Sequence, residues 1–205
     1  MLARSLTVAL AAVALTAGAA AAQATGTASF NAPYRAFQKY EFGGTVSFNE
    51  GDATGLEGQL RFGYKAFDVG FRGGMLFRDG DDPILIGAEG RGRVLTHNEQ
   101  FPLDGAIIAG LGLAFDGGTI GNVPLGLSLG RRVDLENSEI SLVPYVQPTG
   151  NLLFGDLPFD DVEFGFSLGF GLDARLSRFF DARVSASFGT TYGIEGFAIS
   201  AVWIR

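Results

Sequence analysis

The stretch VEFGFSLGFGLD, residues 162–173, places a large apolar side chain at every second position and mostly glycine or serine between them. A period of two is that of a β-strand, whose successive side chains point to opposite faces. In a soluble sheet the second face would carry charged and polar side chains for water, whereas here it is mostly small. This combination is typical of a strand with lipid on its bulky face and a filled barrel lumen on its small face. The stretch therefore predicts a transmembrane β-barrel.

Nine other segments of the chain alternate in the same way. They span residues 40–48, 56–65, 67–77, 84–94, 103–115, 123–130, 140–147, 180–188 and 197–203. Most are close to the roughly 9–11 residues that a tilted strand needs to cross the hydrocarbon of a bilayer. Segment 140–147 is the least regular, because Pro144 removes a donor from the ladder. The pattern predicts an all-β domain over residues 37–205, a transmembrane antiparallel up-and-down β-barrel with ten strands, or eight as the alternative.

The connections between these segments are consistent with a meander. Turn-forming residues occur at 49–52, 79–83, 116–118 and 189–193, and together with residues 149–159 they are expected on the outer side of the membrane. The alternate connections, near residues 65–66, 96–101, 131–138 and 175–178, are expected in the periplasm. An even number of strands then returns the C-terminus to the periplasm.

The N-terminus has the organisation of a secretory signal peptide. Arg4 provides the positive charge, residues 6–15 the apolar core, and residues 20–24 the small side chains of a cleavage site. About ten apolar residues are too few for a helical span. We therefore predict a cleaved signal peptide over residues 1–22 and export. Residues 23–36 show no clear period and are expected to form an irregular segment, either a short helix or a stretch against the periplasmic mouth of the barrel.

The composition excludes several classes of protein. The chain has no cysteine, so disulfides cannot supply stability. Its net charge is −7, which becomes −8 once Arg4 leaves with the signal peptide. This acidity argues against a nucleic-acid partner and against a polybasic membrane anchor.

Aromatic and charged residues mark the two faces of the predicted strands. Girdles of aromatic residues are expected at both membrane interfaces. The girdle candidates are Tyr40, Tyr64, Phe67, Phe180 and Trp203 near the periplasmic ends and Phe48, Phe77, Phe115, Phe164 and Phe188 near the outer ends. The charged candidates for the lumen are Glu41, Glu57, Arg61, Lys65, Asp68, Arg72, Glu89, Arg91, Arg93, Asp104, Glu163, Asp173, Asp181 and Arg183.

The mixed charges of the lumen have two interpretations. One is a polar conduit whose charges select ions or small solutes. In that case the selectivity candidates are Arg61, Arg72, Arg91, Arg93 and Arg183. The other is a plugged interior in which the charges pair with one another, because a barrel of eight to ten strands leaves little room for water.

The chain resembles the small bacterial outer-membrane β-barrel families, the OmpA/OmpX-like group and its porin-like relatives. The residues that carry the resemblance are the strand 162–173, the turn Leu176-Ser177-Arg178-Phe179 and the run 181–185 that follows it. The resemblance implies a location in the outer membrane of the cell envelope, and as partners outer-membrane lipid, lipopolysaccharide and the barrel-assembly machinery. The chain departs from the pattern at its end, because members usually finish on an aromatic residue and Trp203 stands two places early.

Few residues are candidates for chemistry. His97 is the sole histidine and lies in a predicted periplasmic connection without a serine beside it, so a general base is not expected. Asp79, Asp81 and Asp82 could offer oxygen ligands to a divalent cation, but they lack the spacing of a calcium loop, and a solvated turn is preferred. The pair Asp160 and Asp161 is interpreted in the same way. We expect no catalytic residue, cofactor or metal.

These observations lead to three functional hypotheses. The first is a non-enzymatic outer-membrane protein, structural or acting as a narrow pore for ions or small solutes. The second is a cell-surface adhesion or interaction barrel that binds through its outer loops, above all residues 149–159. The third is a soluble lipocalin-like carrier, which would have its bulky apolar face turned inward around a ligand.

Overall fold

A computed structural model describes residues 24–33, 39–80, 82–157, 162–189 and 195–205. The predicted signal peptide and the residues Asp81, Asp160 and Asp161 lie outside this part of the chain. Among the described residues, no helix has the length and apolar character needed to cross a membrane.

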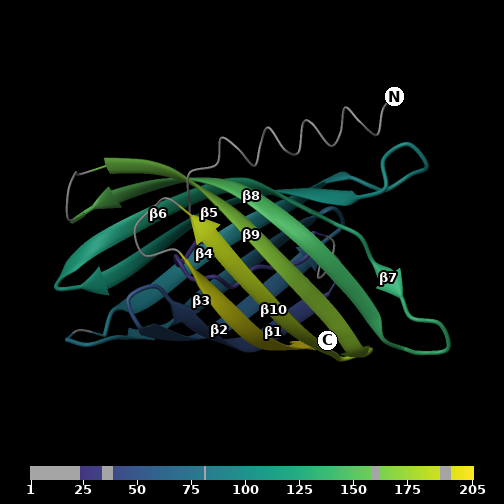
Figure 1. Cartoon of the computed structure of the whole chain (residues 1–205), viewed down its shortest axis with the longest axis horizontal. Helices are drawn as coiled ribbons and strands as arrows, with labels where there is room; N and C mark the ends of the chain where they lie inside the picture. Colours follow the sequence, from purple (N-terminus) through teal and green to yellow (C-terminus); the bar gives the residue numbers. More distant parts are fainter. Residues whose placement is uncertain (1–23, 34–38, 81, 158–161, 190–194) are drawn as a thin grey trace.

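The described residues form one antiparallel sheet that closes on itself (Figure 1). Its ten long strands are β1 (Tyr40–Asn49), β2 (Ala53–Tyr64), β3 (Phe67–Phe77), β4 (Ile84–Leu95), β5 (Asp104–Asp116), β6 (Gly118–Gly130), β8 (Ser141–Gly155), β9 (Val162–Ser177), β10 (Phe180–Gly189) and β11 (Gly196–Ile204). Each long strand pairs with the next long strand along the chain, so that β6 pairs with β8. The pairing of β1 with β11 closes the ring. The short β7 (Val133–Asp134) pairs only with β8. The predicted ten-stranded barrel is confirmed, and the eight-stranded alternative is wrong.

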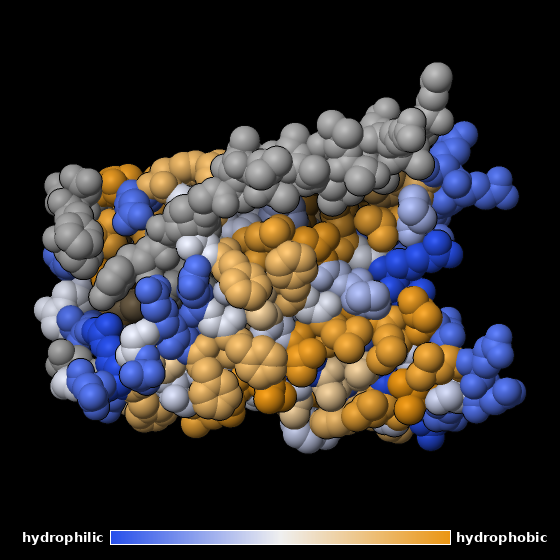
Figure 2. Space-filling view, viewed as in Figure 1, coloured by the Kyte–Doolittle hydropathy of each residue, from blue (hydrophilic) through white to orange (hydrophobic). Residues whose placement is uncertain are grey.

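The bulky face of each strand points outward. Phe164 of β9 is 62% exposed and Leu125 of β6 is also 62% exposed, while their inward neighbours are buried or half-buried. Figure 2 shows apolar side chains over the middle of the visible face and polar side chains gathered toward both ends. This is the reverse of a soluble carrier barrel, which would bury its bulky apolar face around a ligand.

Aromatic side chains lie at both ends of the barrel. We call the end where β1 begins and β11 finishes the proximal end, and the opposite end the distal end. At the proximal end the Trp203 ring stacks on Phe42 with centroids 5.8 Å apart and meets Phe180 edge-on at 5.2 Å. At the distal end Phe48 of β1 faces Phe197 of β11 in register. Edge-on and offset pairs of this kind add to the free energy gained by burial in lipid.

Strand β8 differs from the sequence prediction. A strand was expected over residues 140–147 and an outer loop over residues 149–159, but β8 continues to Gly155. One of the two prolines in this strand lies where it costs little. Pro148 falls at an interruption of the β6–β8 ladder, where no pairing is formed between Gly126–Thr149 and Leu129–Val146. A missing backbone donor is tolerated at such a position.

Candidate functional site

The N-terminal segment lies inside the barrel. Residues 24–33, here called the plug, run through the lumen as turns and irregular chain and are drawn in purple in Figure 1. Every plug residue except the half-buried Gly26 is buried. Over residues 24–33 the chain is neither a helix nor a stretch at the mouth but an irregular segment within the lumen, while residues 23 and 34–36 of the predicted segment lie outside the described part.

The first part of the plug is bonded to β1, β2 and β3. The Thr27 hydroxyl donates a hydrogen bond of 2.6 Å to Glu57 Oε2 on β2. The hydroxyl oxygens of Ser29 and Thr45 lie 3.4 Å apart, and Arg72 donates a bond of 3.0 Å to Ser29 Oγ. Side chains from three neighbouring strands thus satisfy polar atoms of the plug that have left water.

A serine on the opposite wall binds the middle of the plug twice. The Ser185 hydroxyl on β10 donates a hydrogen bond of 2.6 Å to the carbonyl oxygen of Ala28. The backbone N–H of Phe30 donates back to the same hydroxyl at 3.3 Å. Because a hydroxyl both donates and accepts, Ser185 satisfies two backbone groups of an irregular segment.

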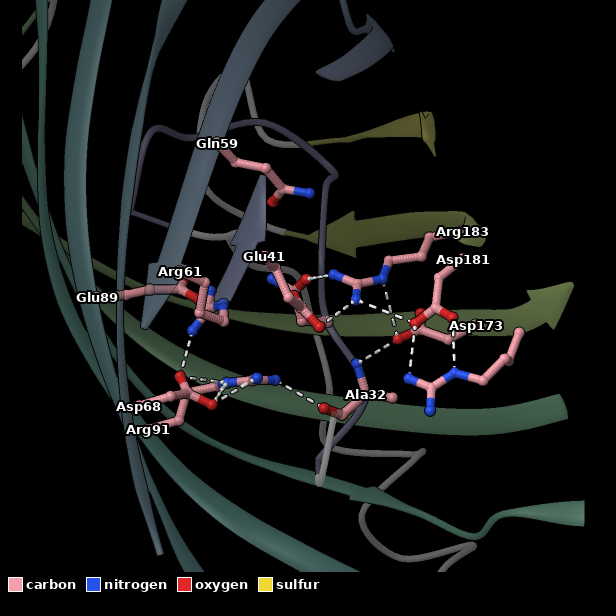
Figure 3. Close-up of polar contacts among 12 residues, drawn as sticks. Ala32, Glu41, Gln59, Arg61, Asp68, Glu89, Arg91, Asp173, Asp181 and Arg183 are labelled. Atoms are coloured by element: carbon pink, nitrogen blue, oxygen red, sulfur yellow. Dashed lines mark hydrogen bonds and ion pairs between the residues drawn. The ribbon is translucent and has the colours of Figure 1, made fainter. Parts of the chain in front are cut away.

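The last part of the plug is bonded to charged residues near the proximal end (Figure 3). The Ala32 N–H donates a bond of 3.1 Å to Asp173 Oδ2 on β9, and Arg91 on β4 donates a bond of 2.7 Å to the Ala32 carbonyl oxygen. Arg183 on β10 donates to Asn31 Oδ1. These charge-assisted bonds fix the plug to opposite walls of the barrel.

Glycines of the lumen face provide the space that the plug occupies. A Cβ built on Gly112 of β5 would lie 1.5 Å from the Ala24 carbonyl oxygen, and one on Gly169 of β9 would lie 2.7 Å from the Phe30 ring. Neither position can carry a side chain while the plug is in place. Close approach of the plug therefore explains the small residue at Gly169 of strand 162–173, whereas a Cβ on Gly171 would meet the Tyr145 side chain of β8 at 2.2 Å.

The charged residues of the lumen pair with one another. Arg61 contacts both Asp68 and Glu89, and Arg91 holds Asp68 at 2.7 Å. On the facing wall Arg183 lies 2.9 Å from Glu41 (Figure 3). Charges buried this deeply are tolerated only when they are paired and hydrogen-bonded.

Two further pairs extend this network. Arg72 lies 3.7 Å from Glu57, the carboxylate that also binds Thr27, and Arg175 lies 3.0 Å from Asp181. Arg175 was not among the predicted lumen residues. The interleaved signs on neighbouring strands therefore come together in contacts of opposite charge, in which Arg61 and Arg183 each meet more than one carboxylate.

The remaining sequence candidates lie at the margins of the lumen. Lys65 was expected in the lumen but is exposed in the two-residue turn after β2, with φ of 56° and its ammonium 5.2 Å from the Tyr64 ring centroid. The expectation failed because β2 ends one residue earlier, at Tyr64. Arg93 is half-buried at a register shift of β4, and Glu163 is half-buried at the distal mouth.

The single histidine does have a carboxylate partner. The backbone N–H of His97 donates to Asp104 Oδ1 at 3.1 Å, and its Nδ1 lies 3.1 Å from both oxygens of the same carboxylate. The His97 side chain is 49% exposed at the proximal end. Among the described residues no group of three or more histidine, cysteine or acidic side chains is arranged to hold a metal ion.

The plug contacts were missed by sequence reasoning, although a signal was present. Thr25, Thr27, Ser29 and Asn31 place a small polar residue at every second position. The stretch is too short to indicate a strand next to a signal peptide. The residues between these four are mostly small, so it lacks the bulky apolar face of the predicted strands. Their partners Thr45 and Ser185 lie among predicted strand residues but are uncharged, so they were not singled out.

Comparison with known proteins gives no family assignment. No family model and no curated protein matches the chain. It is similar to a chain of a bacterial polysaccharide outer membrane secretin, with 10% identity and a TM-score of 0.48, covering 75% of this chain and 56% of that one.

Two other solved structures are similar at the same level. One comes from the de novo design of transmembrane β-barrels, with 12% identity, a TM-score of 0.39 and coverage of 82% and 95%. The other is the β domain of the Bordetella autotransporter BrkA, with 15% identity, a TM-score of 0.47 and coverage of 81% and 97%. Since these likenesses are distant, the function is inferred below from the chain's own geometry.

Proposed function

We propose that this chain is a non-enzymatic β-barrel of the bacterial outer membrane whose lumen is closed by its own N-terminal segment, so that it serves the envelope as a structural protein and not as an open pore. The observation that carries the proposal is the buried plug, bonded along its length to strands on opposite walls. An ion crossing the barrel would have to displace these bonds.

The exterior supports insertion into a membrane. Outward side chains in the middle of the strands are apolar, as with Leu60 and Phe71, which are 52% and 49% exposed and adjacent in register. Such a continuous apolar surface is far larger than the patches that soluble monomers expose. Outer-membrane lipid, lipopolysaccharide and the barrel-assembly machinery are its proposed partners, and no catalytic activity is proposed.

The alternative of a cell-surface adhesion barrel has less support. Its main surface was to be the loop at residues 149–159, and the part of this stretch up to Gly155 belongs to β8. The connections at the distal end that are fully described are short, with Gly117 alone between β5 and β6. Recognition in barrels of this architecture usually needs longer loops.

The proposal is tested by electrical recording from processed protein in planar bilayers. We expect no openings from the full chain, because the plug fills the lumen. A variant that lacks residues 25–32 should open, because it keeps all the strands and their inward charges. Heat-modifiable migration on gels confirms that each protein has folded, and cell fractionation tests the outer-membrane location.

If the deletion prevents folding, a second variant still tests whether the plug closes the lumen. Ser29→Cys with Thr45→Cys can tie the plug to β1 by a disulfide, since the two hydroxyl oxygens lie 3.4 Å apart. Frequent openings of the full chain that persist with this disulfide formed would contradict a closed barrel. Openings that stop on oxidation would show that the plug leaves the lumen spontaneously, and would likewise overturn the structural role.

A further inference from the structure

The inward face of the barrel changes character at the distal end. Over most of the lumen it carries charged and hydroxyl residues, but near the distal mouth it presents Leu76, Leu85, Ile120 and Leu153. Leu85 and Leu153 are 3% and 6% exposed although they face the lumen. In the proximal half, inward apolar side chains such as Val143 and Val202 lie among the charged pairs, whereas the distal cluster lines an open cavity.

These side chains surround a cavity of about 390 Å³ that opens toward the distal mouth. Residues 24–27 of the plug form part of its lining. The volume is within the roughly 300–1,000 Å³ of sites for small molecules, which are lined mainly by apolar side chains with a few polar groups. Water in contact with this apolar lining costs free energy that an aliphatic ligand would recover.

The charged side chains around the cavity are mostly carboxylates, which accept hydrogen bonds. Asp116, Asp156 and Glu163 line it together with a single guanidinium, that of Arg78, which pairs with Asp116. Asp156 Oδ2 accepts a bond of 2.7 Å from the Thr119 N–H. The three carboxylates and one guanidinium give the lining a net charge of −2, and it stays negative, at −1, when cleavage after residue 22 places an α-ammonium next to Ala24.

An amide side chain also lies at the cavity. The amide nitrogen of Asn49 donates to Ser47 Oγ at 3.0 Å, but its Oδ1 has no hydrogen-bond partner among the described residues. Asn49 lies in the cavity lining. This oxygen is closed off from solvent, so the ligand chemistry follows from the carboxylates: a cationic group would complement them, whereas an anionic group would be repelled.

We propose that the distal cavity binds a small aliphatic molecule carrying a cationic amine, with its chain against Leu85 and Leu153 and its ammonium toward Glu163. This assigns a binding site to a barrel otherwise proposed to be structural. It requires that the plug be in place, because residues 24–27 form one side of the cavity.

The test uses processed protein in lipid nanodiscs, with the leucine methyl groups labelled for NMR. Octylammonium is the probe, and octanoate is the matched anion of the same length. We expect saturable shifts of the Leu85 and Leu153 methyl signals with octylammonium, and binding of octanoate weaker by about tenfold or more. Glu163→Gln should weaken octylammonium binding without unfolding the barrel.

Filling the cavity provides the steric control. Leu85→Trp should abolish the shifts at Leu153, while Ile86→Trp should not, because Ile86 is the neighbouring outward residue and is 45% exposed. If Leu85→Trp fails to fold, Ala114→Leu fills the same cavity from β5.

Three results would overturn the proposal. They are the absence of saturable shifts, equal binding of the two probes, and shifts that survive in a folded variant with the cavity filled. None of them is a conductance measurement, so a failure of the site can be told apart from a failure of the closed barrel on which the site rests.

Discussion

Asp173 accepts a hydrogen bond of 3.1 Å from the backbone N–H of Ala32, although the two residues are 141 positions apart in the chain. A carboxylate on β9 thereby holds a segment that precedes the first strand. The same plug residue receives a bond from Arg91 on β4. Ala32 is thus fixed between opposite walls, and the plug becomes part of the folded interior rather than a tail that rests at an opening.

Arg91→Met should destabilise the barrel strongly. It removes the donor to Ala32 and one of the two arginines that pair with Asp68, in a place where both side chains are at most 1% exposed. Loss of one partner of a buried pair costs about 3–5 kcal/mol. We expect the free energy of unfolding, measured in urea with lipid vesicles, to fall by this amount.

The matched control for this variant is Arg132→Met. Arg132 pairs with Asp134 outside the barrel wall, where the side chains are 45% and 66% exposed. Such a surface pair contributes only about 0–1 kcal/mol. Equal losses from the two variants would mean that the interior pair is solvated and that the lumen is not filled.

Gly112→Val should expel the first part of the plug. A Cβ at Gly112 would meet the Ala24 carbonyl oxygen at 1.5 Å, which is a contact with backbone and not with the end of a flexible side chain. We expect higher conductance in planar bilayers, because the plug can no longer occupy its path. Gly58→Val is the control, since a Cβ there faces outward and lies 3.9 Å from its nearest neighbour. Silent recordings from a folded Gly112→Val protein would show that the plug does not control the lumen.

Leu60→Arg tests the membrane-facing surface. Leu60 is an outward residue near the middle of the barrel wall, and an arginine at the bilayer midplane costs about 2–4 kcal/mol of folding free energy. Tyr64→Arg places the same charge at the proximal end of the same strand, where the cost falls to about 0–1 kcal/mol. Unfolding in urea with lipid vesicles compares the two. A cost that does not depend on position along β2 would contradict a lipid-facing belt.

The barrel itself was predictable because each strand carries its own evidence. In residues 162–173 every second side chain is large and apolar, and local alternation fixes both the strand and the direction of its side chains. The limits of β8 were less predictable. Pro144 and Pro148 indicate the end of a strand in sequence, and only the interrupted β6–β8 ladder explains why the strand continues past Pro148.

The plug was not predictable in the same way. Its conformation is irregular, the polar alternation from Thr25 to Asn31 is too short to indicate a strand, and its partners come from strands far away in sequence. Ser185 lies 157 positions from Ala28, and the two meet only because the barrel closes. The charged pairs fall between these cases, since alternation placed Arg61 and Glu89 in the lumen but did not define which residue each would pair with.

The most direct test of the buried plug is a disulfide between it and the barrel wall. The chain has no cysteine, so Ser29→Cys with Thr45→Cys introduces one possible pair, at positions where the hydroxyl oxygens are 3.4 Å apart. Ser29→Cys with Val46→Cys is the control, because Val46 is the next residue of β1 and points outward. Oxidation of folded protein followed by mass spectrometry should show a nearly complete internal disulfide in the first variant and none in the second. Free thiols in the folded Ser29–Thr45 variant would contradict a plug inside the lumen.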